Sequence, residues 1–459
     1  MFRRRSKPEL NQELPAVSVV AYGAGDIANS MTFSTIGMFL LVYYTDVAGI
    51  PAAAAGSVLL FAGLFNGFTD VVAGRIADRN PQRRLGKFRP FLLLGALPLG
   101  LCVAMFHVPD IDPAGALTYA YLSYFAFCLV YSMVNVPYGA LAGAITRHPR
   151  GRARLASART VGGLTTTSFL GIFIAPQLTN DADIQGILTT LTLSFAVLGT
   201  MLYAFTALAT REHIPQSAPK LSLREAAAVL RGNGPLLILC LSSLLFMTSN
   251  VALNTAKIFY LREVFHRLDL FAVVAAAQVV ITLALAATVP RMVARWGKRA
   301  IYISGGLAGA AGGIVVFIAP ENLVGLALAG MFLNLLGSAA MSIVMWALVA
   351  DTVEYGEWKS GHRTDGINYS LLASTRKFGM ACGGGLAAFA LAWGGYTSGA
   401  PEQSTTAELG IRAAAGLVPA IILLLAVGAM AWYRLTDKTH AYLVAQIQQR
   451  NVEPEAPTR

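Results

Sequence analysis

The chain alternates between long apolar runs and short polar joints. A helix needs about 20 apolar residues to cross a bilayer, and runs of roughly that length recur along all 459 residues. Between them the joints are rich in Pro, Gly, Asp and Asn, residues that end helices. We therefore predict an all-α polytopic membrane protein with helices over 17–45, 51–77, 90–108, 114–144, 155–177, 187–210, 234–261, 268–290, 300–319, 322–350, 366–394 and 409–433.

Basic residues occur in every second joint. Lys or Arg is present in 3–7, 75–89, 147–154, 211–231, 291–299, 359–363 and from 434 onward, and absent from 46–52, 108–115, 177–186, 319–323 and 394–410. Because cytoplasmic loops carry an excess of Lys and Arg, both termini are predicted to be cytoplasmic, in a plasma (inner) membrane. The basic N-terminus is predicted to be a cytoplasmic tail and not a signal peptide.

One joint contradicts this alternation. Segment 262–269 carries Arg262 and Arg267 on the predicted outer side, and Lys257 lies near the end of the preceding helix. Lys257 is expected to extend its ammonium group outward to water. The sequence assigns no role to these three cations.

The longest cytoplasmic joint divides the helices into two sets of six. The predicted organisation is a tail over 1–16, a bundle over 17–210, a central cytoplasmic loop over 211–233, a second bundle over 234–433 and a tail over 434–459. An internal repeat supports it: GRIADRNPQRR at 74–84 and PRMVARWGKR at 290–299 each follow the second helix of their half. Such repeats are typical of transporters. Ala294 stands in the second copy where Asp78 stands in the first, so the ion pairs of the two copies should differ.

Composition excludes several other classes of protein. The chain is 55% hydrophobic and 13% charged, whereas soluble domains average about 25% charged. Most of the cations behind its net charge of +11 lie in short loops between apolar runs, a pattern that argues against nucleic-acid binding. The four Cys and six His lack metal-ligand spacing, and no catalytic motif has a plausible context. We expect no enzyme activity, no metal and no cofactor.

Asp70 is the strongest candidate for a functional side chain. A carboxylate within a membrane helix costs about 2.5–3.5 kcal/mol on insertion scales and is functional by default. Asn66 and Gly74 lie four residues to either side and therefore share its helix face. Two interpretations stay open, a site for a cation or proton and a structural salt bridge near the cytoplasmic end.

Further polar residues interrupt the other apolar runs. Carboxylates, amides and Arg can bind sugar hydroxyls, and an aromatic face can cover a sugar ring. Pro137 interrupts the fourth helix, and broken helices commonly line substrate cavities. For the charged members the alternative is a fixed pair between helices, and for the aromatic ones it is packing. The candidates are Asp26, Tyr131, Ser132, Asn135, Arg159, Trp346 with nearby Asp351, and Lys377 with Arg376.

A long signature connects these residues to a known family. The spacing Asp70-x3-Gly74-x3-Asp78-x7-Gly86-Lys-Phe-Arg-Pro90-Phe-Leu-Leu-x-Gly95-Ala96, with matching stretches at 43–49, 135–142, 344–357 and 369–377, resembles the glycoside–pentoside–hexuronide:cation symporters. The resemblance implies a twelve-helix major facilitator fold, two six-helix bundles with pseudo-two-fold symmetry, and alternating access. The gating-loop pattern of that superfamily matches Gly74, Asp78, Arg79, Arg83 and Arg84.

Residue by residue, the resemblance also implies two sites. The sugar contacts would include Asp26, Tyr131, Asn135, Arg159, Trp346 and Lys377, and the cation site would correspond to Asn66, Asp70 and Ser132. Asn66 replaces a carboxylate of the family's sodium-coupled branch. Asn135 and Gly139 replace a carboxylate and a tryptophan of its galactoside site. A galactoside is therefore disfavoured.

A single carboxylate favours proton coupling. Sodium prefers several oxygens and a strong negative field, whereas a proton needs one acid. We therefore expect import of a glycoside or hexuronide, glucuronide-like, by a monomer coupled to H⁺ in preference to Na⁺. Open alternatives are a sodium-coupled or export-directed carrier of a neutral oligosaccharide, and a membrane sugar sensor that does not transport.

Overall fold

The computed structural model describes residues 14–80, 85–146, 149–179, 181–212, 232–361, 365–400 and 402–452. Most of these residues form long helices, which short joints connect. The first half contains α1 (Ala16–Val42) with η1 (Tyr43–Val47), α2 (Ala52–Arg79), α3 (Arg89–Leu92) with η2 (Leu93–Gly95) and α4 (Ala96–Met105), α5 (Pro113–Ile145), α6 (Pro149–Phe169) with η3 (Leu170–Ile174) and η4 (Ala175–Gln177), and α7 (Ile184–Ala209). The second half contains α9 (Gly234–Phe259) with η5 (Tyr260–Val264), α10 (Leu270–Trp296), α11 (Lys298–Ile318), α12 (Val324–Ser360), α13 (Asp365–Gly394), and α14 (Thr405–Arg412) with η6 (Ala413–Leu417) and α15 (Val418–Ala431); α16 (Asp437–Val452) follows.

Each predicted apolar range coincides with one helical stretch, but some helices are longer than predicted. The largest difference is α12, which runs well past the predicted end at 350, to Ser360. Its last turns, DTVEYGEWKS, are polar and still form helix, because there the helix packs against α16 and the Trp358 indole N–H donates to Gln446 Oε1 (2.6 Å). Hydropathy marks the part of a helix inside the bilayer and not where the helix itself ends.

Apolar composition alone identifies only part of the membrane domain. Within the described residues, nine helices are long and apolar enough to cross a membrane, and Arg89–Met105 forms a shorter apolar stretch. The remaining stretches, α6 and α13, carry Arg159 and the pair Arg376–Lys377 within their length. The charged side chains that make these helices less apolar are the same ones that make them candidates for the functional site.

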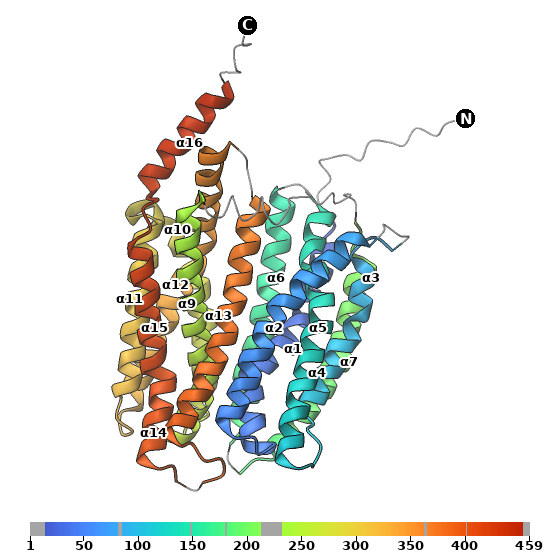
Figure 1. Ribbon diagram of the computed structural model, residues 1–459, viewed down its shortest axis with the longest axis vertical. Helices are drawn as coiled ribbons and strands as arrows, with labels where there is room; N and C mark the ends of the chain where they lie inside the picture. Colours follow the sequence, from blue (N-terminus) through green and yellow to red (C-terminus); the bar gives the residue numbers. More distant parts are fainter. Residues whose placement is uncertain are drawn as a thin grey trace, which may run out of the picture.

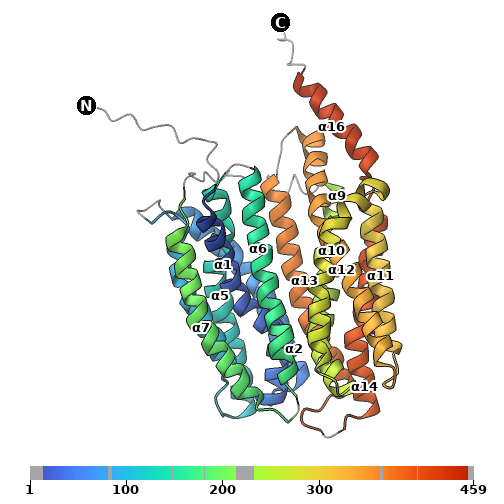
Figure 2. The same ribbon diagram turned by 180° about the vertical axis from the view of Figure 1, so that it is seen from behind.

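The helices form two bundles that stand side by side, each running along the long axis of the molecule (Figure 1). Seen from behind, α6 and α13 both stand at the boundary between the bundles (Figure 2), where α13 contacts α2 and α10 contacts α6 and η3. The start of α1 lies at the same end of the molecule as α16, which extends beyond the bundles. We call this the inner end, after the predicted orientation, and the opposite one the outer end.

The two halves repeat the same local structure at their outer ends. The first helix of each half finishes in a π-helical turn, η1 with the sequence YYTDV and η5 with YLREV. The first residue of each turn, Tyr43 and Tyr260, bonds through its hydroxyl to the main chain at the end of the third helix of its own half, at Val108 (2.8 Å) and Val316 (2.6 Å). This correspondence places Asp46 and Glu263 at equivalent positions of the repeat.

The bundles approach most closely along α2 and α13. Gly56 faces Ala388, Gly63 faces Ala381 and Gly67 faces the Phe378 ring, so small residues let the two helices pack tightly over their outer halves. A Cβ atom built on Gly63 would lie 2.5 Å from Ala381 Cβ and 2.9 Å from its Cα. The α13 backbone would have to move to admit it.

Gly63→Val should therefore destabilise the purified protein. Overpacking of this kind costs about 1–3 kcal/mol, and we expect a lower thermal unfolding temperature in detergent. Gly100→Val is the matched control, because nothing lies within 4 Å of a Cβ atom at Gly100, which is also inside a helix. Equal losses in both variants would show that helix propensity, and not contact between the bundles, is responsible.

Candidate functional site

Asp70 lies in a polar cluster inside the membrane domain. Ser132 of α5 donates its hydroxyl to Asp70 Oδ1 (2.7 Å) and approaches Asn66 Oδ1 (3.1 Å). Thr69 Oγ1 lies 2.8 Å from Ser132 Oγ. The structure thus brings together Asn66, Asp70 and Ser132, the three residues predicted for the coupling site, and adds Thr69 to them.

The second carboxylate oxygen of Asp70 pairs with an ammonium group of the other bundle. Lys377 Nζ of α13 contacts Asp70 Oδ2, and the two side chains are 26% and 18% exposed. A charge pair between two helical bundles forms or breaks as the bundles move together or apart. Asp70 is therefore both an ionisable group and part of a salt bridge between the bundles. The two interpretations left open by the sequence, a cation or proton site and a salt bridge, are thus compatible.

Asp26 and Arg159 form a second charge pair, within the first bundle. Arg159 Nε donates to Asp26 Oδ1 (2.9 Å), and the guanidinium lies 5.4 Å from the centroid of the Tyr138 ring. Tyr138 in turn stacks on Tyr22 and donates its hydroxyl to the Tyr22 carbonyl (2.7 Å). The Arg159 side chain is still 43% exposed. The aromatic support holds the guanidinium in place while its free face stays available to a ligand.

The other predicted sugar contacts are dispersed. Tyr131 is buried and stacks on Phe33 and Phe127, so its ring is part of the packing. Trp346 is 46% exposed and stacks on Tyr369, with the Arg376 guanidinium 5.3 Å from the Trp346 ring. Their roles as sugar contacts stay predictions.

Asn135 has a buried polar atom. Its Oδ1 has no hydrogen-bond partner within the described structure. Buried acceptors are rarely left unpaired, so this atom is available to a ligand hydroxyl. Its assignment as a sugar contact is untested.

The predicted gating loop lies partly outside the described residues, because Arg83, Arg84 and the side chain of Asp78 fall there. A Cβ atom built on Gly74 would lie 3.8 Å from Val136 Cγ1 of α5, and Arg79 is exposed. In the second copy, Lys298 pairs with Asp351 (2.6 Å) at the inner end. Asp351 thus belongs to an ion pair of the second copy, and its role beside Trp346 stays a prediction.

A cavity of about 300 Å³ lies between the bundles. Helices of both halves contribute to it, and among the predicted site residues it includes Asn66 and Lys377. Asp26, Tyr131, Asn135, Arg159 and Trp346 do not line it. Its remaining polar lining was not selected from the sequence: Ser34, Tyr124, Thr167, Asn250, Asn254, Thr255, Lys257 and Gln278.

Lys257 points into the protein, contrary to the expectation from its position. It is 3% exposed, donates to Asn254 Oδ1 (2.9 Å) and lies 4.8 Å from the centroid of the Phe271 ring. Outward extension was wrong because the residue lies on the cavity-facing side of α9 together with Asn250 and Asn254, at spacings of four and three residues. That spacing was visible in the sequence as a polar face within an apolar run.

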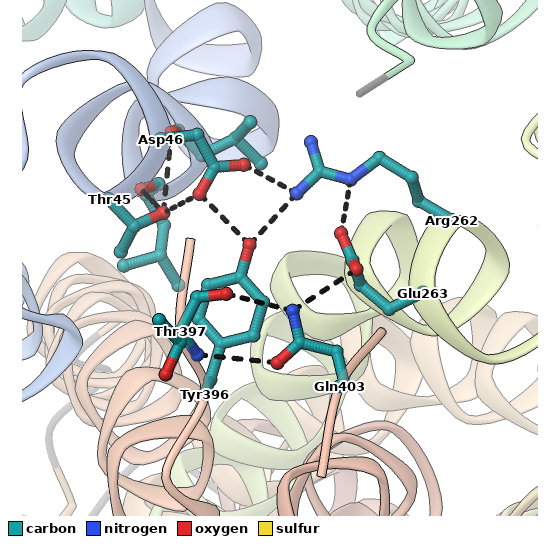
Figure 3. A network of polar contacts seen from close by, with 9 residues as sticks. Thr45, Asp46, Arg262, Glu263, Tyr396, Thr397 and Gln403 are labelled. Carbon is teal, nitrogen blue, oxygen red and sulfur yellow. Dashed lines mark hydrogen bonds and ion pairs between the residues drawn. The ribbon is translucent and has the colours of Figure 1, made fainter. Parts of the chain in front are cut away.

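A network of charges joins the two bundles at the outer end (Figure 3). Arg262 contacts Asp46 of η1 in the first bundle and its own neighbour Glu263 (2.7 Å), and it donates to the Tyr396 hydroxyl (3.0 Å). Tyr396 donates to Asp46 (3.0 Å), and Gln403 donates to Glu263 (3.3 Å). We call Asp46, Arg262, Glu263 and Tyr396 the outer charge network.

The network explains the joint that broke the charge alternation. Arg262 is 4% exposed and binds both Asp46 and its repeat equivalent Glu263, so its charge is neutralised inside the protein. Arg267 is exposed and pairs with Asp269 (2.8 Å). Both cations are therefore paired with nearby carboxylates. The positive-inside rule counts only Lys and Arg, so it does not register this pairing.

The tight packing between the bundles lies toward the outer end. The cross-bundle contacts of α2 and α13 extend from Gly56 near the outer end of α2 to Asp70, past its middle. Closer to the inner end, the side chains of Arg159 and Trp346 are nearly half exposed. In the orientation predicted from the charge alternation, the cross-bundle contacts hold the outer end closed, as in an inward-facing state.

Comparison with known proteins gives consistent results. The family model described as "MFS/sugar transport protein" matches residues 21–437. The "Glucuronide carrier protein homolog" of Escherichia coli K12 is 39% identical over 446 residues, covering 96% of this chain and 97% of that protein. The "Putative sulfoquinovose importer" of Salmonella typhimurium LT2 is 31% identical over 440 residues, covering 94% and 92%.

A solved structure shares the fold. The inward-open xylose transporter XylE of E. coli superposes with a TM-score of 0.61 at 15% identity, covering 94% of this chain and 99% of that one. At this identity the likeness concerns architecture alone. It confirms the predicted fold class, two helical bundles of the major facilitator type.

Proposed function

The chain belongs to the MFS/sugar transport protein family, and from this membership we propose that it imports a glucuronide-like glycoside or hexuronide together with a proton. The family and the fold make it a membrane transport protein of the sugar symporter type. Substrate, coupling ion and direction are the parts that we propose.

The contact between Asp70 and Lys377 carries the proposal. It joins the two bundles beside the cavity, at an acid whose other oxygen accepts from Ser132. Protonation of Asp70 would remove the charge that attracts Lys377 and so weaken this contact. Binding of one proton would thereby change the balance between the inward-facing and outward-facing states, which is what coupling requires.

The choice of an acidic sugar rests on charge and on relatives. Lys257 and Lys377 line the cavity, and no Asp or Glu among the described residues does. Glucuronides and sulfoquinovose, which appear in the names of two relatives, are sugars that carry an acidic group. A cationic cavity favours such ligands over neutral ones.

Sodium coupling is the alternative that a specific observation favours. Oxygen atoms of Asn66, Thr69, Asp70 and Ser132 lie within one cluster, and hard cations take oxygen ligands. However, the cluster holds a single carboxylate, and Lys377 already neutralises it. A weak field of this kind favours a proton over a sodium ion.

Transport into proteoliposomes tests the proposal. We expect an inward-directed proton gradient to drive accumulation of methyl β-D-glucuronide, with alkalinisation of the external medium and no need for sodium. Methyl β-D-galactoside is the comparison substrate. Sodium-dependent uptake without proton movement would show that sodium, and not the proton, is the coupling ion. Binding without exchange in counterflow would indicate a sensor that does not transport.

A further inference from the structure

Lys257 is buried in the wall of the cavity without a counter-charge. Its ammonium donates to Asn254 Oδ1 (2.9 Å) and lies 4.8 Å from the centroid of the Phe271 ring. No ion pair among the described residues includes it, and none of their Asp or Glu side chains lines the cavity. A buried ammonium is costly unless an anion compensates it.

Three other cations are already compensated, and the further candidate Arg376 lies against the Trp346 ring and does not line the cavity. Lys377 pairs with Asp70, Arg159 pairs with Asp26, and Arg262 pairs with Asp46 and Glu263. An anionic substrate that approached any of them would have to compete with a resident carboxylate. Lys257 offers its charge without such competition.

Neutral polar groups surround the ammonium. Asn254 donates to the main-chain carbonyl of Asn250 (2.8 Å) and to its side chain (3.2 Å), which fixes both amides on one face of α9. Gln278 of α10 lines the same cavity. Amides both donate and accept, so they suit the hydroxyl groups of a sugar, and about 300 Å³ is enough for a monosaccharide ring.

We propose that Lys257 binds the acidic group of the substrate, a carboxylate or sulfonate carried on the sugar ring, while Asn250 and Asn254 bind neighbouring hydroxyls. The inference rests on the proposed function in that the cavity holds a sugar. It goes further in assigning recognition of the acid to Lys257 and not to Arg159 or Lys377. Lys257 would thus be the residue that distinguishes acidic from neutral glycosides.

Two ligands that differ only at the acidic carbon test this assignment. Methyl β-D-glucuronide and methyl β-D-glucoside are titrated by calorimetry into purified wild-type, Lys257→Met and Lys257→Arg proteins. We expect Lys257→Met to weaken glucuronide binding at least about 30-fold, with the glucoside changed less than about 3-fold, and Lys257→Arg to retain part of the preference. Methyl sulfoquinovoside shows whether a sulfonate is recognised in the same way.

Lys359→Met is the matched control, because Lys359 is an exposed lysine at the inner end that donates to the Gly232 carbonyl (2.8 Å). It should leave both affinities unchanged. If Lys257→Met weakens both ligands equally, or neither, the assignment to Lys257 is wrong while the proposed function stands. If wild-type protein binds neither sugar at millimolar concentration, the sugar-acid site and the proposed substrate class fail together.

Discussion

Asp70→Asn is expected to abolish proton-driven accumulation of substrate, by a factor of about 100 or more. An amide cannot bind the coupling proton, so the proton gradient can no longer drive transport through this residue. The substitution also leaves the Lys377 ammonium without its carboxylate. Breaking one side of a buried pair costs about 3–5 kcal/mol, and partial exposure of both groups places this pair toward the lower end of that range. The measurement is uptake into vesicles with an imposed pH gradient, followed by counterflow without a gradient.

The two measurements should give different results. Counterflow needs only binding and the change of state, so we expect it to be reduced but present in Asp70→Asn and largely restored by Asp70→Asn with Lys377→Met, in which no unpaired charge remains. Asp269→Asn is the control, since Asp269 pairs with Arg267 in an exposed loop. If Asp70→Asn still accumulates substrate like the wild type, Asp70 is a structural salt bridge and the coupling site lies elsewhere.

The features that the sequence predicts well are those set by local composition. A run of about 20 apolar residues must be helical in a bilayer, because its main-chain polar groups have no other partners there. The twelve helical ranges and the position of Asp70 therefore follow from the chain itself. Asn66 and Ser132 were selected with Asp70 through the helix spacing and the family signature, and the structure places all three within hydrogen-bonding distance.

What the sequence did not predict are contacts between distant segments. Tyr396 lies about 350 residues from Asp46, and neither position stands out in its own segment. Lys257 was expected at the surface because a lysine near a helix end usually reaches water. Which face of α9 borders the cavity depends on how the two bundles pack. That information is spread over both halves, and one helix cannot supply it.

The outer charge network could have been found from the repeat. YYTDV and YLREV occupy equivalent places at the ends of the first helix of each half. Aligning them relates Asp46 to Glu263 and leaves Arg262 beside Glu263 with no equivalent in the first half, where Thr45 stands. Arg262 can therefore bind two carboxylates that the pseudo-two-fold symmetry relates, one from each bundle. Such an arrangement can hold the two bundles together, and we call this role a lock.

Arg262→Met is expected to open the outer end. Arg262 binds carboxylates from both bundles, and its removal leaves Asp46 and Glu263 buried with like charges and one partner fewer. Losing about 3 kcal/mol from the closed state shifts the equilibrium between the two states by about 150-fold. The outward-facing population should therefore rise by up to this factor, with its cavity accessible from that side.

Accessibility of the cavity measures this shift. Gly37 lines the cavity and has open space around it, so Gly37→Cys introduces a thiol there without a clash. In a background without the four native cysteines, a membrane-impermeant maleimide applied from outside should label this position slowly in the parent and, by the shift just given, at least about 30-fold faster with Arg262→Met. Arg267→Met, in the same outer joint but exposed, should label like the parent.

Exchange of the two charges separates a lock from a merely stabilising contact. Asp46→Arg with Arg262→Asp retains a pair across the bundles but places the new carboxylate next to Glu263, so closure should be restored only in part. Adding Glu263→Gln removes that repulsion and should lower labelling from outside further, toward the parent rate. A lock requires this order: fastest in Arg262→Met, slower in the exchange, slowest in the exchange with Glu263→Gln. If all variants label at the parent rate, the glycine contacts of α2 and α13 are sufficient to hold the outer end closed, and the network serves only stability.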